Sequence, residues 1–359
     1  MSYPRLEVDI TKLCYNADTV LGWCREHNIE AAFVGKCVLA DRRILNAVLP
    51  RGFTAYADSR EENLENVEYN TPRILLRIAM ADRAEEIVQC ADISLQSEIP
   101  TIKAIGDAAF RAGKKHKVIL MIDLGDLREG IYYELGDEIL EAARTVVEHP
   151  GLELYGVGTN LTCYGSIMPD ETNMGNLVAI AEWLRKELGV PVPIVSGGNS
   201  SSVGLMKEGR MPAGVNQLRL GESILLGTDT AIGEKFPELR DDAFILETQL
   251  VELKKKPSKP VGVTSVNAFG EHVVYEDKGP MRRGILAIGR QDVNLDGLTP
   301  LDPRVSIVGG SSDHLIVDLT RADGYELGDI VRFKLSYGAL LAAYTSPNVT
   351  KGYCWSAEF

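Results

Sequence analysis

The residue in this chain with the clearest capacity for covalent chemistry is a lysine at the end of an apolar run. The stretch Glu30-Ala-Ala-Phe-Val-Gly-Lys36 places Lys36 at the tip of a predicted buried strand. A lysine there costs free energy unless its ammonium reaches water, is paired, or is used. The ordinary interpretation is a side chain that extends from the strand end into solvent. The chemical alternative is a lysine that forms a Schiff base with a phosphate-bearing aldehyde cofactor.

Two segments further along the chain could bind the phosphate of such a cofactor. The segment Ser196-Gly-Gly-Asn-Ser-Ser-Ser202 ends an apolar run and leads into a helical pattern, so its N–H groups and hydroxyls could surround an anion. It would equally suit a plain turn with serine N-caps. Arg219 lies in the apolar segment Leu218-Arg-Leu-Gly-Glu-Ser223, where Gly221 permits close approach of the backbone. A structural ion pair is the alternative for Arg219.

The elements that would position these residues follow a repeated order of short apolar runs and amphipathic helical patterns. The runs are Ala31–Lys36, Thr54–Ser59, Arg73–Ala79, Ala91–Gln96, Val118–Leu124, Leu154–Leu161, Pro193–Ser196 and Gln217–Leu225. The helical patterns are Asp41–Leu49, Ile99–Ala112, Leu135–Glu148, Asn173–Leu188 and Val203–Glu208. Eight near-continuously apolar strands that alternate with helices predict an α/β fold, a closed (β/α)8 TIM barrel.

Two features of this pattern bear on alternative folds. The helical links after Ala79 and after Ser202 are weak, so an open doubly wound sheet is the alternative to a closed barrel. No Gly-x-Gly-x-x-Gly motif opens a helix after the first strand, which argues against a dinucleotide site.

From about residue 236 onward, the sequence changes to short β-rich runs separated by Gly, Pro and Asp. These runs are Phe244–Leu253, Lys259–Ser265, His272–Glu276, Gly284–Gly289, Val305–Val308, Leu315–Leu319 and Ile330–Leu335. No helical period intervenes, so we predict a barrel domain of residues 1–235 and a C-terminal all-β domain of residues 236–359. Residues 1–12, which include the run Leu6–Ile10, could pair with the β-domain.

Composition and charge exclude several classes of protein. The chain has 359 residues, 45% hydrophobic and 25% charged, and a formal net charge of −13. An acidic chain argues against nucleic acid and anionic membranes as partners, and no apolar stretch is long enough to span a membrane. The five histidines show no metal-ligand spacing and the six cysteines form no CxxC pair. We therefore expect no metal site, reduced thiols and a cytoplasmic location.

Lys36, the Gly197–Ser202 turn and the pair Arg219/Gly221 occur in an order that resembles the alanine racemase family. The members of this family are pyridoxal-phosphate enzymes with a barrel and a β-domain, and the chain is most similar to its ornithine racemases. The segments that carry the resemblance are Val118–Gly130, Asn160–Gly165, Pro193–Ser202, Leu218–Ser223, Tyr275–Gly279 and Ser311–Asp318. They span nearly the whole chain.

The resemblance implies that Lys36 holds pyridoxal 5'-phosphate as a Schiff base. The other residues implied at the cofactor are Arg128, Asn160, Asn199, Ser200, Arg219, Gly221, Glu222 and Tyr337. Among these, Arg219 would face the pyridine nitrogen and keep it unprotonated, because arginine does not give up its proton. This favours racemisation over decarboxylation. Arg128 would lie beside the phenolic oxygen and the substrate, and Asp313 would border the substrate from the partner subunit of a homodimer.

The departures from the family pattern concern the proton donors. Racemisation through two bases needs a second group opposite Lys36. The family's tyrosine-containing turn reads Ile288-Gly-Arg-Gln-Asp292 here, and Asn160 stands in place of the usual histidine. The candidates for the second base are Cys163, Tyr164 and His314. A mechanism in which Lys36 serves both faces is the alternative.

A basic substrate would require an acidic group for its distal ammonium. The candidates are Asp126, Glu129, Glu276, Asp277 and Asp292, although each could simply be solvated at the surface. We expect a racemase of a small-molecule basic amino acid, with ornithine preferred over lysine. The alternatives are a lysine or broad-specificity racemase that includes alanine, a decarboxylase, a non-catalytic carrier of pyridoxal phosphate, and a barrel hydrolase without the cofactor.

Overall fold

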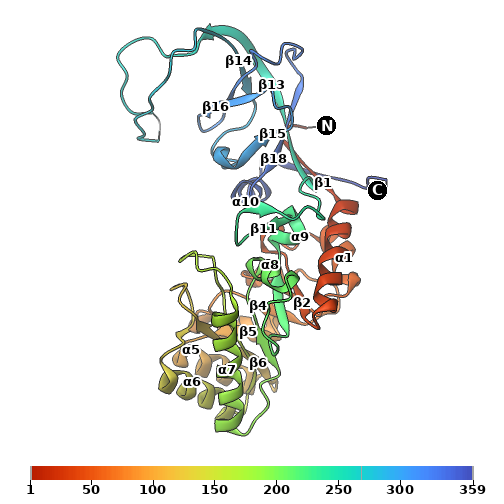
Figure 1. The fold of residues 1–359 in the computed structure, drawn as a ribbon, viewed down its shortest axis with the longest axis vertical. Helices are drawn as coiled ribbons and strands as arrows, with labels where there is room; N and C mark the ends of the chain where they lie inside the picture. Colours follow the sequence, from red (N-terminus) through yellow and green to blue (C-terminus); the bar gives the residue numbers. More distant parts are fainter. Residues whose placement is uncertain (1, 268, 358–359) are drawn as a thin grey trace. The chain divides into compact units, whose positions relative to one another are not determined.

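The computed structural model describes residues 2–267 and 269–357. Their contacts divide the chain into two units, which are traced in Figure 1. One unit is Lys12–Arg240, and it contains the parallel strands. The other unit joins the residues up to Thr11 with those from Asp241 onward, and its strands form a separate sheet.

The first unit is a closed barrel of parallel strands. Its eight strands are β2 (Glu30–Val34), β3 (Ala55–Asp58), β4 (Arg73–Leu75), β5 (Ile93–Gln96), β6 (His116–Asp123), β8 (Leu152–Gly158), β9 (Ile194–Ser196) and β10 (Gln217–Leu220). Each pairs in parallel with the next in this order, and β10 pairs with β2 to close the ring. The predicted (β/α)8 barrel is confirmed, and the closure rules out the open sheet.

The helices of this unit precede, connect or follow the barrel strands along the chain. They are α1 (Ile10–Glu26), α2 (Arg42–Val48), α3 (Glu61–Glu65), α4 (Ala84–Cys90), α5 (Ile99–Arg111), α6 (Gly136–Glu148), α7 (Glu171–Leu188), α8 (Val203–Lys207) and α9 (Glu222–Leu226). The two links that looked weak in the sequence contain the short helices α4 and α8. Three minor strands, β7 (Ile131–Tyr132), β11 (Thr228–Asp229) and β12 (Glu234–Lys235), complete the unit.

The barrel strands are apolar on both faces because each face packs against a different core. Small and medium side chains fill the inside of the ring, among them Ala32, Ala55, Ile119 and Met121. Alternate residues of the same strands, such as Leu120 of β6, pack outward against the helices. Burial on both sides explains why these strands appear in the sequence as continuous apolar runs.

The second unit contains an antiparallel sheet with strand order β15-β18-β13-β14-β17-β16. These strands are β13 (Phe244–Pro257), β14 (Pro280–Leu286), β15 (Leu298–Pro300), β16 (Ser306–Gly310), β17 (Leu315–Asp318) and β18 (Ile330–Leu335). The N-terminal strand β1 (Arg5–Asp9) pairs antiparallel with β13 and parallel with β19 (Thr350–Cys354). The described part of this unit thus draws on both ends of the chain.

Two expectations for the β-rich region are wrong. A helix, α10 (Tyr337–Thr345), follows β18, because Ser336 accepts from the N–H of Ala339 as an N-cap and the next residues favour a helix. The runs Lys259–Ser265 and His272–Glu276 form no strand. The β13–β14 ladder ends at the pair Pro257 and Pro280, so these runs lie beyond its last rung.

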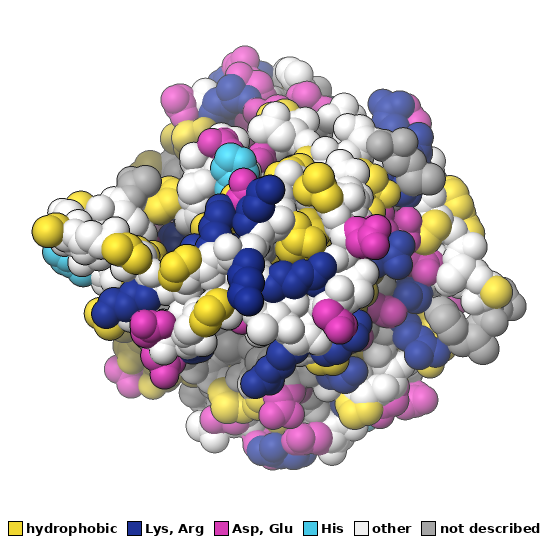
Figure 2. Space-filling view, turned by 90° about the horizontal axis from the view of Figure 1, so that it is seen from above, with side chains coloured by type: hydrophobic (Ala, Val, Ile, Leu, Met, Phe, Trp, Pro, Cys, Tyr) yellow, Lys and Arg dark blue, Asp and Glu magenta, His cyan; other side chains and the backbone are white. Residues whose placement is uncertain are grey.

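The residues between β13 and β14 instead expose apolar side chains. Val261, Val263 and Val274 are between 92% and 105% exposed. This segment projects to the left in Figure 1. It projects to the left in Figure 2 as well, where hydrophobic side chains are visible on its surface. Valine favours strands only where it packs against neighbours, and without such packing its propensity is insufficient to form one.

All six cysteines are free thiols, and four of them are buried. Across the described ranges, no helix combines the length and the apolar character needed to cross a membrane.

Gly35, which directly follows β2, is packed so closely that adding one methyl group should lower the stability of the fold. A Cβ added at Gly35 would lie 2.6 Å from Cε2 of Tyr56. Tyr56 is fully buried, and its hydroxyl donates to Asp58 at 2.7 Å. Gly35→Ala should lower the free energy of unfolding by about 1–3 kcal/mol, because the ring would have to move and break this bond.

The measurement is urea unfolding of the cofactor-free protein. The matched control is Gly22→Ala in α1, where an added Cβ meets nothing within 4 Å. That substitution should stabilise by up to about 1 kcal/mol, because alanine favours the helix. Equal stability of Gly35→Ala and the parent protein would contradict the proposed clash.

Candidate active site

Lys36 lies at the C-terminal end of the barrel, where enzymes of this architecture place their active sites. It follows β2 and Gly35 and begins a short 3-10 turn, Lys36–Val38. The side chain is half-buried, and it makes no ion pair or hydrogen bond with any residue that the structure describes. An amine in this situation can react with a bound aldehyde without first breaking an ion pair.

The Gly-Ser turn after β9 is tied to the end of β10. The Ser200 hydroxyl accepts from the N–H of Gly221 at 3.3 Å and of Ser223 at 3.2 Å. Asn199 caps the following turn by accepting from the N–H of Ser201 at 2.8 Å. Gly198 has a φ of +101°, a backbone conformation that few residues other than glycine adopt. The sequence-predicted phosphate-binding residues Asn199, Ser200 and Gly221 are therefore brought together.

Arg219 points into the barrel from β10 and is only 2% exposed. Its guanidinium donates to the Ser196 hydroxyl, to the Thr159 carbonyl oxygen at 2.7 Å and to Oδ1 of Asn160 at 2.9 Å. Burial lowers the pKa of Arg219 to about 10. These acceptors are neutral, so the simple structural ion pair considered from the sequence is wrong.

The loop after β6 places Arg128 and Glu129 beside this arginine. The Arg128 guanidinium donates to both oxygens of the Glu129 carboxylate, and Nδ2 of Asn160 donates to Oε1 of the same carboxylate. Asn160 follows β8, so it bridges the two loops. Arg128, Asn160 and Arg219 therefore belong to one hydrogen-bonded network.

Cys163 and Tyr164 lie on the loop after β8, but their environments differ. The Cys163 thiol accepts from Nδ2 of Asn199 at 3.2 Å. Burial raises the pKa of this thiol above its ordinary value, although Arg128 and Lys36 lower it in part. The Tyr164 side chain is 74% exposed. Cys163 is exposed as well, so what distinguishes it from Tyr164 is its hydrogen bond with Asn199, another predicted site residue.

Glu222 begins α9 directly after Gly221. Burial raises the pKa of its carboxyl to about 7, and Lys36 lowers it in part, which shows that the two charges interact. A Cβ on Gly221 would lie 2.9 Å from the carbonyl oxygen of Val34, so glycine allows the ends of β10 and β2 to approach closely. The side chain of Glu222, and not its backbone alone, belongs to the surroundings of Lys36.

Three of the predicted site residues belong to the second unit. Asp313 accepts from the Gln291 side chain at 2.6 Å, His314 is exposed, and Tyr337 is the first residue of α10. Their roles at the cofactor or at the substrate stay predictions.

The five acidic residues considered for binding a distal ammonium differ in their hydrogen-bond and ion-pair partners. Asp126 accepts from three backbone N–H groups, and Asp292 accepts from the side chains of Ser346 and Asn348. Asp277 accepts from the N–H of Gly279, and Glu276 pairs with a neighbouring lysine at the surface. Glu129 is the candidate that joins the network of the barrel end.

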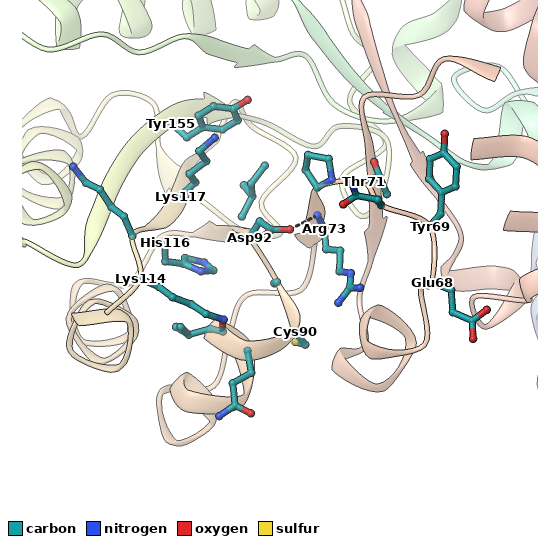
Figure 3. A pocket seen from close by; sticks show the side chains of 17 residues that line it. Glu68, Tyr69, Thr71, Arg73, Cys90, Asp92, Lys114, His116, Lys117 and Tyr155 are labelled. Carbon is teal, nitrogen blue, oxygen red and sulfur yellow. Dashed lines mark hydrogen bonds between the residues drawn. The ribbon is translucent and has the colours of Figure 1, made fainter. Parts of the chain in front are cut away.

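A cavity of about 800 Å³ lies at the opposite ends of the strands, where β4, β5 and β6 begin. Figure 3 shows that its charged side chains point in different directions instead of converging. Asp92 accepts from the N–H of Arg73 at 2.9 Å, and the Lys117 ammonium lies 4.4 Å from the ring centre of Tyr155. His116 forms a hydrogen bond with the Ser94 hydroxyl, and burial lowers the pKa of the His116 imidazole to about 4. Each of these groups has a partner of its own and they do not converge on one point, so the candidate site is the Lys36 end of the barrel.

Comparison with known proteins agrees with the geometry at the Lys36 end. The profile of the alanine racemase N-terminal domain matches residues 9–229 of this chain, from β1 to β11. The chain belongs to the alanine racemase family. The lysine, the Gly-Ser turn and the buried arginine all lie within the matched part.

Relatives within the alanine racemase family cover nearly the full chain. The chain is 44% identical to ornithine racemase of Acetoanaerobium sticklandii over 351 residues, which cover 97% of this chain and 99% of the relative. It is 35% identical to lysine racemase of Thermotoga maritima over 356 residues, covering 98% and 99%.

Solved structures of alanine racemases share the fold. The enzyme of Streptomyces lavendulae has a TM-score of 0.77 at 16% identity, covering 99% of each chain. The enzyme of Bartonella henselae, whose structure has covalently bound pyridoxal phosphate, has a TM-score of 0.73 at 18% identity, covering 98% and 99%.

Some features of this site were not predicted from the sequence. The contact of Gly35 with Tyr56 and the hydrogen bond of Asn160 to Glu129 join residues from different strands, and no local motif marks them. The interaction of the Glu222 side chain with Lys36 had a signal, because an acidic residue directly after Gly221 faces the strand that carries the lysine.

The raised pKa of Glu222 predicts a pH-dependent stability. In the folded state this carboxyl keeps its proton to about pH 7, whereas in the unfolded state it loses the proton near its ordinary pKa. Its unfavourable contribution therefore grows as the pH rises between these values and is complete above about pH 7.

Glu222→Gln should remove this dependence, because glutamine has no proton to lose. The difference in the free energy of unfolding between Glu222→Gln and the cofactor-free parent should increase from about pH 5 to pH 8, with the variant more stable at pH 8. Urea unfolding at several pH values measures it. The control is Glu141→Gln on the exposed face of α6. A difference that does not change with pH would show that Glu222 ionises normally.

Proposed function

We propose that this protein is a pyridoxal-phosphate-dependent racemase that interconverts L- and D-ornithine. The supporting observation is the unpaired, half-buried Lys36 amine at the same barrel end as the Gly-Ser turn and the buried Arg219. The 44% identity to an ornithine racemase over nearly the whole chain supports the substrate. We further propose that it acts in the cytoplasm as a homodimer whose subunits share the site.

The residues present fit the cofactor. Gly198 and Gly221 let the backbone segments after β9 and β10 approach closely, and Asn199, Ser200 and the start of α9 lie there to hold a phosphate. Arg219 is a buried donor that meets neutral oxygens, so a ring nitrogen could serve as a further acceptor. Bound pyridoxal phosphate would supply electron withdrawal that makes the α-proton of an amino acid removable.

The side chains of the chain would divide the remaining tasks. Lys36 would bind the cofactor and move a proton at the α-carbon on one face. Arg219 would keep its charge and leave the ring nitrogen unprotonated, which limits electron withdrawal and favours return of the proton over other reactions. Cys163, protonated at neutral pH because burial raises its pKa, would give a proton on the other face.

A lysine-specific enzyme is the second candidate, supported by the 35% identity to a lysine racemase. A non-catalytic carrier of the cofactor is the alternative of another class. Both full-length relatives are racemases, which favours catalysis.

Enantiomer-resolved turnover of ornithine, lysine and alanine tests the proposal. We expect the highest kcat/KM for ornithine, and loss of turnover by more than about 10⁴-fold in Lys36→Ala, because one residue would serve as both cofactor link and base. The variant should also lose the absorbance of the lysine-linked cofactor. Activity confined to alanine would refute the substrate, and bound cofactor without exchange of the α-proton in heavy water would support the carrier.

A second experiment addresses the proton donor opposite the lysine. Cys163→Ala should lower kcat for ornithine by about 10²–10⁴-fold while the absorbance of bound cofactor persists, because only proton transfer is removed. Cys163→Ser should retain the hydrogen bond from Asn199 but remain slow, since a hydroxyl is the poorer acid. Cys354→Ala, a change at a cysteine of the other unit that forms no disulfide, is the control. Full activity of Cys163→Ala would leave His314, Tyr164 or Lys36 alone as the second base.

A further inference from the structure

Four side chains at the C-terminal end of the barrel form one unbroken series of hydrogen bonds. Arg128 donates to Glu129, Asn160 donates to the same carboxylate, and Arg219 donates to Oδ1 of Asn160 at 2.9 Å. Asn160 lies 31 residues from Glu129 and 59 from Arg219 along the chain. The series therefore links the loop after β6, the loop after β8 and strand β10.

The amide of Asn160 fits this position in one orientation. Its NH2 group can only donate and its oxygen can only accept. Glu129 offers acceptors on one side, and Arg219 offers donors on the other. A reversed amide would place NH2 against the guanidinium and oxygen against the carboxylate, which loses both bonds and adds repulsion. The carboxylate of Glu129 therefore fixes the orientation of the Asn160 amide. That orientation in turn places the amide oxygen as an acceptor for Arg219.

The burial of these side chains strengthens the hydrogen bonds that join them. The side chain of Glu129 is 16% exposed and that of Arg128 39%, while Arg219 is almost fully buried. No carboxylate among the described residues bonds the Arg219 guanidinium directly, and Glu129 is linked to it through the neutral amide of Asn160. Hydrogen bonds of this kind are stronger in a buried site than in water.

We propose that Glu129 is a positioning residue, which fixes the Asn160 amide and through it the Arg219 guanidinium. The inference rests on the proposed function, in which Arg219 faces the cofactor ring. One carboxylate then links the two arginines that the resemblance places at the ring nitrogen and beside the phenolic oxygen, bonding Arg128 directly and Arg219 through Asn160. Because an amide cannot take up or lose a proton near neutral pH, the series transmits orientation without transmitting a proton.

Cofactor affinity gives a readout that is independent of turnover. Cofactor-free protein is titrated with pyridoxal phosphate, and the absorbance of the lysine-linked form yields Kd. Glu129→Ala should raise Kd by more than about tenfold, because hydrogen bonds to a buried charged group are lost. Glu129→Gln should give a smaller rise, since its oxygen can still accept from Asn160. Glu141→Gln on α6 removes the same charge from an exposed position and should leave Kd unchanged.

A titratable group in place of the amide provides the second variant. Asn160→His should introduce a pH dependence, because imidazole changes charge near neutral pH and touches the guanidinium. The charged groups around Asn160 and Arg219 are Arg128 and Glu129, and the titratable thiol of Cys163 is kept neutral by its raised pKa. Glu222 titrates near pH 7 in both proteins, so it cancels in their difference. The absorbance of the lysine-linked cofactor should therefore depend on pH differently in Asn160→His and in the parent protein, with the difference changing between about pH 6 and 8.

The outcomes separate the inference from the proposed function. If the parent protein never shows a lysine-linked cofactor, the proposed function fails. If the parent binds the cofactor and both Glu129→Ala and Asn160→His match it in affinity and pH response, the proposed function stands and the positioning role is refuted. If Glu129→Ala is too unstable to purify, a flat pH response of Asn160→His would still refute it.

Discussion

The burial of one positive charge is the constraint on which the arrangement of this barrel end depends. Arg219 is 2% exposed, and no carboxylate in the described part of the chain bonds it directly. Removing a guanidinium from water costs several kcal/mol unless its donors are satisfied. The barrel meets this cost with oxygens from Ser196, Thr159 and Asn160, which lie at the ends of the two preceding strands. The glycine at position 158 also leaves space, because a Cβ there would lie 3.4 Å from Nη1 of the arginine.

The order of the strands explains why residues far apart in sequence meet at this point. Strands β8, β9 and β10 are neighbours, so their C-terminal ends deliver Asn160, Ser200 and Arg219 to one place. Closure of the ring through β10 and β2 then brings Gly221 against Val34 and places Lys36 beside Glu222. Without the β10–β2 pairing the sheet would be open, and β2 and β10 would be its two edges. The lysine and the Gly-Ser turn therefore lie at neighbouring strand ends because the barrel is closed.

The part of this architecture that could be predicted follows from local patterns. Continuous apolar runs predicted all eight barrel strands, because each strand is buried on both faces. Helix α1 was missed although its buried residues Leu13, Ala17, Val20 and Cys24 have helical spacing. Helix α10 was missed because its residues are mostly apolar and show no amphipathic period, although alanine and leucine favour a helix. The valines after Pro257 show the converse error, since β propensity without a partner strand forms no sheet.

The loop that carries Cys163 shows why the remaining site residues could not be assigned from the sequence. A thiol on a loop is a useful proton donor only if the loop is fixed. Asp126, which is 1% exposed, accepts from the N–H groups of Cys163, Tyr164 and Ile167 at 2.9–3.2 Å. This role uses both oxygens of a carboxylate that the sequence offered equally well as a substrate contact. Three residues away, Glu129 uses its two oxygens for Arg128 and Asn160, so the two acidic residues of one short loop divide between holding a backbone and orienting an arginine network. The two carboxylates have different roles because the closed barrel brings different groups next to each of them. The sequence alone does not show which groups these are.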